Sequence, residues 1–161
     1  MGHAASSQLE ALCRRHAGVR LVGLGNWPGV DVSPAEAWHY VVTGDSSKTS
    51  MTFPVEHLAQ AQADWWRLAL SSRLFSKEDT CLISMGGIGG LPWARIHIPT
   101  HAPVLDIFAQ HKECPEFLAM SESGERYLAV TSEENDVWLY LVDCRGGHFR
   151  TLSPEAPHGE R

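Results

Sequence analysis

The sequence lacks any apolar run approaching the roughly 20 residues that a membrane-spanning helix needs. Its N-terminus lacks the basic region and apolar core of a secretory signal peptide. Gly2 followed by Ser6 formally matches the N-myristoylation pattern, but no polybasic patch follows to strengthen such an anchor. The sequence therefore predicts a soluble, cytoplasmic protein with no membrane span.

Closely spaced cysteines and clustered basic residues are also missing. The four cysteines form no CxxC pair, and in a chain of 161 residues that can build its own core we expect free thiols. The 13 lysines and arginines are dispersed, the longest cluster being Arg14-Arg15, and no zinc-finger or aromatic RNA-binding motif is present. Nucleic acid is therefore not an expected partner.

Acidic residues, in contrast, are concentrated in one segment. Residues 113–143 contain eight acids and one base, Arg126, whereas the remaining 130 residues are almost balanced. If this segment forms one surface, it repels nucleic acid and attracts a basic protein. The alternative is a solvated rim that only keeps the protein soluble.

The strongest structural signal is a pair of short strands around a glycine-rich connection. Residues 80–85 and 93–98 are rich in isoleucine and are bounded by turn residues, as the strands of a hairpin are. Residues 54–75 keep a 3.6-residue apolar spacing, which predicts the longest helix. Trp65 and Trp66 point about 100° apart on this helix, so we expect one in the core and one at its edge.

Weaker local signals predict the remaining elements. They are a helix at 8–17 after a capping box, a strand at 19–24, a helical turn at 33–37 running into a strand at 38–43, a strand at 49–53 that pairs with 38–43, a helix at 100–111, and a meander of strands at 116–121, 126–131 and 137–142. Together they predict one α+β domain over residues 1–152, with a flexible tail at 153–161. Its mainly antiparallel sheet carries the long helix and two shorter ones on one side.

The acidic segment leads to the first functional hypothesis, a non-enzymatic protein-binding module for a basic partner. Its aromatic residues are expected to face solvent among the acids, where they would anchor a partner that the charge attracts. An inhibitor, an immunity protein or a secretion chaperone has this physical character. The predicted partner-binding residues are Glu122, Glu125, Tyr127, Glu133, Glu134, Asp136, Trp138 and Tyr140.

The glycine-rich connection supports an alternative, a small-molecule-binding protein or enzyme. Backbone amides of Gly87 and Gly89 could converge on an anion, since glycine permits that geometry. Trp93, Arg95 and His97 lie on one face of the following strand and would complete the site. A phosphate loop would continue with a lysine, a serine or threonine and a helix, which this sequence does not have.

Catalytic and metal-binding patterns are weak. His97, His101, His111 and Cys114 are ligand types for zinc, but Pro99 separates the first two and no general base follows at a recognisable offset. No Gly-x-Ser-x-Gly elbow is present, and cysteine–histidine pairs cannot be recognised by spacing. We therefore predict no metal and no cofactor, and an enzyme is the less favoured interpretation.

Overall fold

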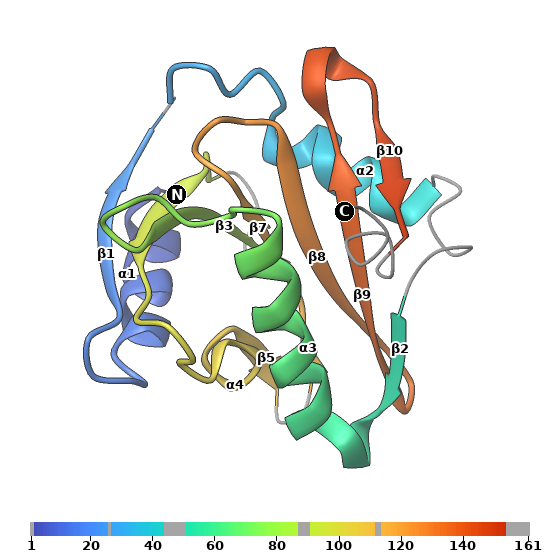
Figure 1. Cartoon of the computed structure of the whole chain (residues 1–161). Coiled ribbons are helices and arrows are strands. Elements are labelled where there is room, and N and C mark those ends of the chain that lie inside the picture. The colour runs from blue at the N-terminus through green and yellow to red at the C-terminus, as the bar shows by residue number, and fades with distance from the viewer. Residues whose placement is uncertain (1, 26, 44–50, 87–90, 112–113, 154–161) are drawn as a thin grey trace.

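The computed structural model describes residues 2–25, 27–43, 51–86, 91–111 and 114–153. Its centre is an eight-stranded antiparallel sheet in the order β1-β4-β3-β7-β8-β9-β10 (Figure 1). The eighth strand, β2, also pairs with β9, near the opposite end of β9 from β10. The strands are β1 Arg20–Leu24, β2 Met51–Pro54, β3 Thr80–Met85, β4 Ala94–His97, β7 Phe117–Met120, β8 Arg126–Glu133, β9 Asp136–Asp143 and β10 Arg150–Leu152. A separate small sheet joins β5 Ala109–His111 to β6 Cys114–Pro115. The predicted α+β class is confirmed.

Four α-helices and two short 3-10 helices complete the described chain. They are α1 Gly2–Cys13, α2 Pro34–Thr43, η2 Val55–His57, α3 Leu58–Ser71, α4 Val104–Ile107 and η3 Arg145–Gly147. No helix in these described ranges is long and apolar enough to cross a membrane. The predicted tail lies outside the described residues from 154 onward.

The predicted hairpin and meander are both present. Strands β3 and β4 pair antiparallel, and β7, β8 and β9 follow one another as antiparallel neighbours. Along β4, Ala94 and Ile96 enter the core, while Arg95 and His97 are half-buried on the other face. The alternation that predicted this strand is therefore seen in the fold.

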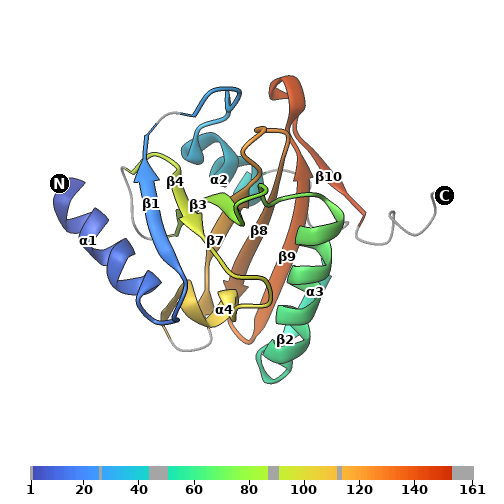
Figure 2. The same ribbon diagram turned by 60° about the vertical axis from the view of Figure 1, so that its left-hand side comes forward.

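The three predicted helices pack on one side of the sheet, as expected, whereas α2, which was predicted as a helical turn and a strand, covers the other face. Helices α1, α3 and α4 share one apolar core with Ile83 and Ile96. Helix α2 packs on the opposite face, where Ala37 and Val41 meet Tyr127. Figures 1 and 2 show α3 and α2 on either side of strands β8 and β9.

Helix α3 follows the predicted apolar stripe, but both of its tryptophans are buried. Trp65 is 0% exposed and Trp66 3%. The indole N–H of Trp66 donates to the carbonyl oxygen of Ala102 at 2.7 Å, and its ring stacks on Phe75. The expectation that one tryptophan lies at the core edge is wrong because these segments cover it.

Helix α2 replaces the strand predicted at 38–43. The backbone N–H of Ser33 donates to Glu36 Oε1, and the N–H of Glu36 donates to Ser33 Oγ, which is a complete capping box. The helix then continues because Ala37 and Val41, four residues apart, pack on the sheet. Strand β2 consequently pairs with β9 rather than with 38–43, and residues 49–50 of its predicted range lie outside the described residues.

The boundaries of α1 and α4 also differ from the predicted ones. Helix α1 spans Gly2–Cys13 rather than 8–17, so its capping-box serine lies inside the helix. The helix predicted at 100–111 is limited to Val104–Ile107. Arg15 Nη1 donates to the carbonyl oxygens of Asp106, Ile107 and Ala109 at 3.0–3.2 Å. This side chain satisfies carbonyls that further helical turns would otherwise use.

Candidate functional site

The acids of the 113–143 segment are divided between the two ends of the β8–β9 hairpin. Glu122 and Glu125 precede β8, whereas Glu133 and Glu134 lie at its far end. Strand β8 has eight residues, and a strand of that length spans about 24 Å. The segment therefore does not form the single acidic surface that the charge count had indicated.

At the first end, most of the negative charge is paired. Arg95 Nε lies 2.8 Å from Glu122 Oε2, and Asp143 Oδ2 lies 2.8 Å from Arg145 Nη2 and 3.7 Å from Arg126 Nε. Burial raises the pKa of Asp143, but hydrogen bonds from Arg145 and the charges of both arginines outweigh burial and lower the pKa below its ordinary value.

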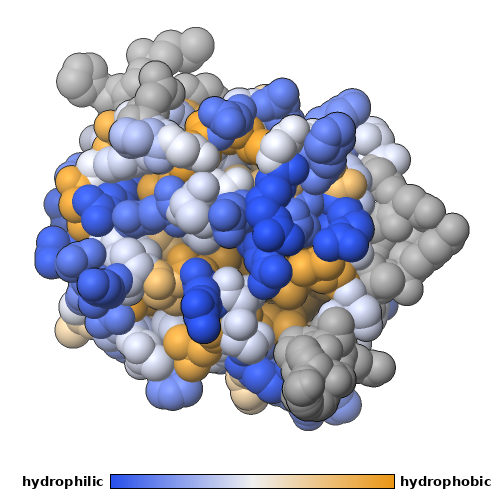
Figure 3. All heavy atoms as spheres, turned by 45° about the horizontal axis from the view of Figure 1, so that its top comes forward, coloured by the Kyte–Doolittle hydropathy of each residue, from blue (hydrophilic) through white to orange (hydrophobic). Residues whose placement is uncertain are grey.

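Tight backbone packing also fixes this end of the hairpin. Gly124 has a φ of +77°, and a Cβ on it would lie 2.4 Å from the carbonyl oxygen of Gly29. Only glycine fits there. The surface seen from this end is mostly hydrophilic, with orange patches separated by blue side chains (Figure 3).

At the opposite end, the acids are unpaired within the described part of the chain. Glu133 and Glu134 are exposed, Asp136 is half-buried, and no ion pair between described residues involves any of them. Next to them on β9, the rings of Trp138 and Tyr140 stack with centroids 6.3 Å apart and an interplanar angle of 19°. We call Glu133, Glu134, Asp136, Trp138 and Tyr140 the acidic end.

The expected solvent exposure of the three aromatic residues is largely wrong. Tyr127 is 0% exposed and Tyr140 only 8%, while Trp138 is half-buried. Tyr127 lies beneath α2, where its hydroxyl donates to the carbonyl oxygen of Ala37 at 3.1 Å. Burial, with Cys144 and Tyr40 nearby, raises the pKa of Tyr127 far above its ordinary value. A role for Tyr127 as a surface anchor is incompatible with this burial.

Tyr140 belongs to the acidic end although it is mostly covered. Burial raises its pKa, a hydrogen bond with Thr131 opposes that rise, and the charge of Glu133 adds to it. Glu133 is thus close enough to influence Tyr140 electrostatically. Strand pairing places Glu133 opposite Asp136 and Thr131 opposite Trp138, so these side chains share one face.

Three residues of the alternative ligand site are engaged in structural contacts. The Trp93 indole N–H donates to the carbonyl oxygen of Val32 at 2.8 Å. Arg95 binds Glu122, and its guanidinium carbon lies 5.8 Å from the Trp27 ring centroid. The His97 imidazole Nδ1 hydrogen-bonds the carbonyl oxygen of Gly18 at 2.9 Å. The other two residues, Gly87 and Gly89, lie outside the described residues.

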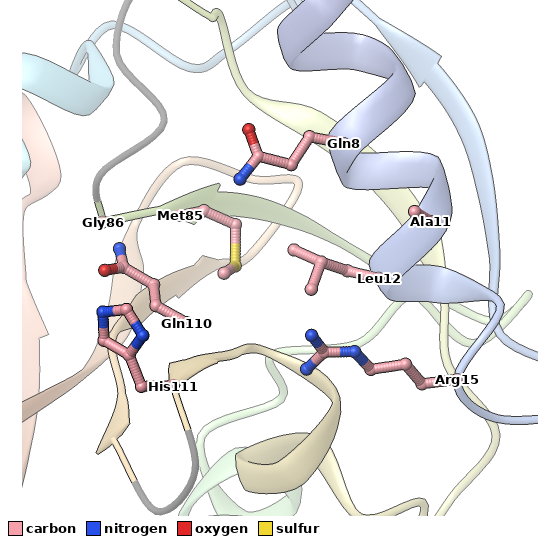
Figure 4. A pocket seen from close by; sticks show the side chains of 8 residues that line it. All are labelled: Gln8, Ala11, Leu12, Arg15, Met85, Gly86, Gln110 and His111. Carbon is pink, nitrogen blue, oxygen red and sulfur yellow. The ribbon is translucent and has the colours of Figure 1, made fainter.

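A hollow does exist where β3 ends, but other residues line it. It has a volume of about 340 Å³ and lies between α1, the end of β3 and β5 (Figure 4). Trp93, Arg95 and His97 are not among its lining residues. The side chains that face it include Gln8, Leu12, Arg15, Met85, Gln110 and His111. We call it the α1 hollow.

Sequence reasoning had no means of finding the α1 hollow as a whole. Gln8, Leu12 and Arg15 follow the spacing of one helical face, and that was its only local signal. Gln110 and His111 come from a strand about a hundred residues later. Only the tertiary fold brings the two groups together.

Within the described ranges, no three or more histidine, cysteine, aspartate or glutamate side chains group as a metal site.

The four cysteines are free thiols, as predicted, and all except Cys114 are buried. Burial raises the pKa of Cys13 to about 11, with Glu10 adding to the rise. It also raises that of Cys144 to about 12, with Asp143 and Glu125 adding to the rise. These buried thiols are poor nucleophiles at neutral pH.

No protein-family model matches the chain, and comparisons with curated proteins and with solved structures find no match.

Proposed function

We propose that the protein is a non-enzymatic binding module whose acidic end contacts a basic protein. The observation that supports this proposal is the difference between the two ends of the β8–β9 hairpin. Arginines pair Glu122 and Asp143 at one end, whereas Glu133, Glu134 and Asp136 form no ion pair with described residues at the other. Unpaired, partly exposed carboxylates are available to a cation from outside.

Three carboxylates within four consecutive residues produce a strong local field. A cation about 4 Å from one carboxylate gains about 1 kcal/mol in water and about 4 kcal/mol near a protein surface. Such a field mainly accelerates association and selects a basic partner over a neutral one. It also repels nucleic acid, so we do not propose a nucleic-acid partner.

The adjacent tryptophan supplies an apolar contact that charge alone does not provide. Trp138 is half-buried and stacked on Tyr140, so it has little side-chain entropy to lose when a partner covers it. Tryptophan is enriched among the residues that dominate binding energy. The acidic end therefore combines attraction at a distance with a rigid contact at its centre.

The backbone at Glu134 adds a further argument. Its φ is +49°, in the left-handed region that favours glycine. A non-glycine residue there costs about 1–3 kcal/mol of local strain. This turn holds the Glu134 carboxylate between β8 and β9, next to Glu133 and Asp136.

This chemistry suits an inhibitor, an immunity protein or a secretion chaperone acting in the cytoplasm on a basic protein. The test is an affinity capture from native cell lysate with the wild type and with Glu133→Lys/Glu134→Lys/Asp136→Lys. The matched control is Glu10→Lys/Glu78→Lys/Glu125→Lys, which changes charge equally at exposed acids elsewhere. Circular dichroism checks that both variants are folded.

We expect one basic protein to be captured in stoichiometric amount by the wild type and the control variant. Its capture decreases at high salt, because screening weakens attraction between exposed charges, and it is lost in the acidic-end variant. Equal capture by all three proteins, or no specific capture, would show that the acidic end is only a solvated surface.

A further inference from the structure

We propose that the α1 hollow binds a small carboxylate that carries an aliphatic group. This inference is independent of the acidic end, because Leu12 and Met85 belong to the core on one face of the sheet and Trp138 and Tyr140 pack with the core on the other. It also differs from the predicted glycine-hairpin site, since its residues come from α1, β3 and β5.

A fixed positive charge stands at one side of the hollow. Arg15 Nη1 is held by the carbonyl oxygens of Asp106, Ile107 and Ala109, which orients the guanidinium. Its Nε and Nη2 donate to no described residue, and no ion pair within the described ranges involves it. An oriented guanidinium edge whose other two donors bind no described residue matches the two oxygens of a carboxylate.

No acidic side chain is among the described residues that line the hollow, although one lies close by. Glu116 approaches Gly86, where an added Cβ would lie 3.2 Å from Glu116 Oε1. His111, which is exposed, lines the hollow with Arg15. Among the described lining residues, Arg15 carries the fixed charge, and Glu116 disfavours a ligand carboxylate beside Gly86, so the carboxylate lies on the Arg15 side of the hollow.

An unpaired hydrogen-bond donor lies at the opposite wall. Gln110 Nε2 is buried and has no partner among the described residues, a situation that costs about 1–3 kcal/mol. The terminal torsion of a glutamine is soft, so the amide can turn toward an acceptor in the hollow. Gln8 faces the same space from α1 (Figure 4). Once turned toward Arg15, either amide would donate to a carboxylate oxygen of the ligand.

The remaining wall is apolar, so it favours a ligand with an aliphatic group over an inorganic anion such as phosphate. Leu12 and Met85 are 7% and 6% exposed and, with Ala11, line the hollow between the polar groups. An aliphatic group would cover them, gaining about 0.8 kcal/mol for each buried CH₂. The volume of about 340 Å³ admits a short aliphatic acid. A single arginine also suits a singly charged carboxylate better than phosphate.

The test is a titration followed by two-dimensional ¹⁵N NMR, with sodium pentanoate as the probe. Pentanamide, which has the same shape without the charge, and inorganic phosphate are titrated in parallel. Gln8→Glu and Gln110→Glu each place a negative charge in the hollow at almost constant side-chain volume. Gln60→Glu, at an exposed position of α3, is the matched control.

We expect saturable shifts of amide signals around the hollow with pentanoate, and at least tenfold weaker binding of pentanamide and phosphate. Gln8→Glu and Gln110→Glu weaken pentanoate binding at least tenfold, whereas Gln60→Glu leaves it unchanged. The triple lysine variant of the acidic end also binds pentanoate normally, which separates this test from that of the proposed function. A tripeptide ending in leucine, as free acid and as amide, shows whether a chain terminus supplies the carboxylate better than a free acid does.

Four results would contradict the proposal, and the first three concern the probe and the variants. They are the absence of saturable shifts with pentanoate and the peptide acid, equal binding of pentanoate and pentanamide, and equal weakening by Gln60→Glu. Binding of phosphate as tight as that of pentanoate would also contradict the assignment to a carboxylate.

Discussion

The hydroxyl of Tyr127 donates a hydrogen bond to the carbonyl oxygen of Ala37 at 3.1 Å, and it does so beneath helix α2. The two residues are 90 positions apart in the chain, so this bond ties α2 to the centre of the sheet. Tyr127 is therefore a structural residue, although it lies in the acid-rich segment.

Replacing this tyrosine tests that role. Tyr127→Phe removes the hydroxyl and keeps the ring, so we expect the free energy of unfolding to fall by about 0.5–1.5 kcal/mol. Urea unfolding measures the change. Because the residue is buried away from the acidic end, binding of a basic partner remains at the wild-type level once the protein is folded. Unchanged stability with weakened partner binding would contradict this assignment.

The Asp143 carboxylate gives the stability a defined pH dependence. Its folded pKa is lowered, so its contribution is present above the unfolded pKa of about 3.9 and is lost as the pH falls through the folded pKa. We expect Asp143→Asn to lower stability at pH 7 by about 1–3 kcal/mol. The same substitution reduces the loss of stability between pH 5 and pH 2.

Urea unfolding of the wild type and Asp143→Asn at several pH values provides the measurement. The control is Glu78→Gln, at an exposed position with no ion pair to another described residue. It changes neither the stability at pH 7 nor the loss of stability at low pH appreciably. Parallel pH profiles for the wild type and Asp143→Asn would contradict the role of the Asp143–Arg145 pair.

The four thiols are predicted to react at two distinct rates. Cys13, Cys81 and Cys144 are buried with raised pKa values, and Cys114 is half-buried. With iodoacetamide at pH 8, we expect one rapid modification, at Cys114, detected by mass spectrometry. Cys114→Ser removes it, and in urea the wild type takes up four labels. Rapid modification of Cys13 in the folded protein would contradict the burial described for α1.

The strained backbone at Glu134 predicts an unusual tolerance of glycine. Glycine relieves the left-handed strain at this position, so Glu134→Gly leaves stability unchanged or raises it by up to about 1 kcal/mol. By contrast, Gln60→Gly, at an exposed position inside a helix, lowers stability by about 1 kcal/mol. Thermal unfolding compares the two variants. Glu134→Gly nevertheless weakens partner binding, since it removes one of the three carboxylates.

Local signals were sufficient where neighbours in sequence are neighbours in the fold. The β3–β4 hairpin and the β7–β8–β9 meander depend on short connections and alternation, and both are present. The apolar stripe of α3 was equally clear, since Ala61, Trp65 and Leu68 are buried as their spacing predicts. These elements needed no information from distant parts of the chain.

Long-range packing decided the features that the sequence did not reveal. Residues 38–43 have strand-like side chains, but contact with the sheet and a complete capping box make them helical. Arg15 donates to carbonyl oxygens at the end of α4 from more than 90 residues earlier in the chain. The acidic segment was recognised by composition, but the ion pairs of Glu122 with Arg95 and of Asp143 with Arg126 depend on contacts that only the fold makes.

The most direct test of the binding proposal places a photoreactive benzoylphenylalanine at Thr52, which is exposed and pairs with Trp138 across β2 and β9. The control carries the same group at Leu70, which is 49% exposed on α3. Irradiation in native lysate, followed by mass spectrometry, identifies what each position contacts. We predict that position 52 crosslinks to one protein with a net positive charge and that position 70 does not. Equal crosslinking from both positions, or none from position 52, would contradict the proposal that the acidic end is the binding surface.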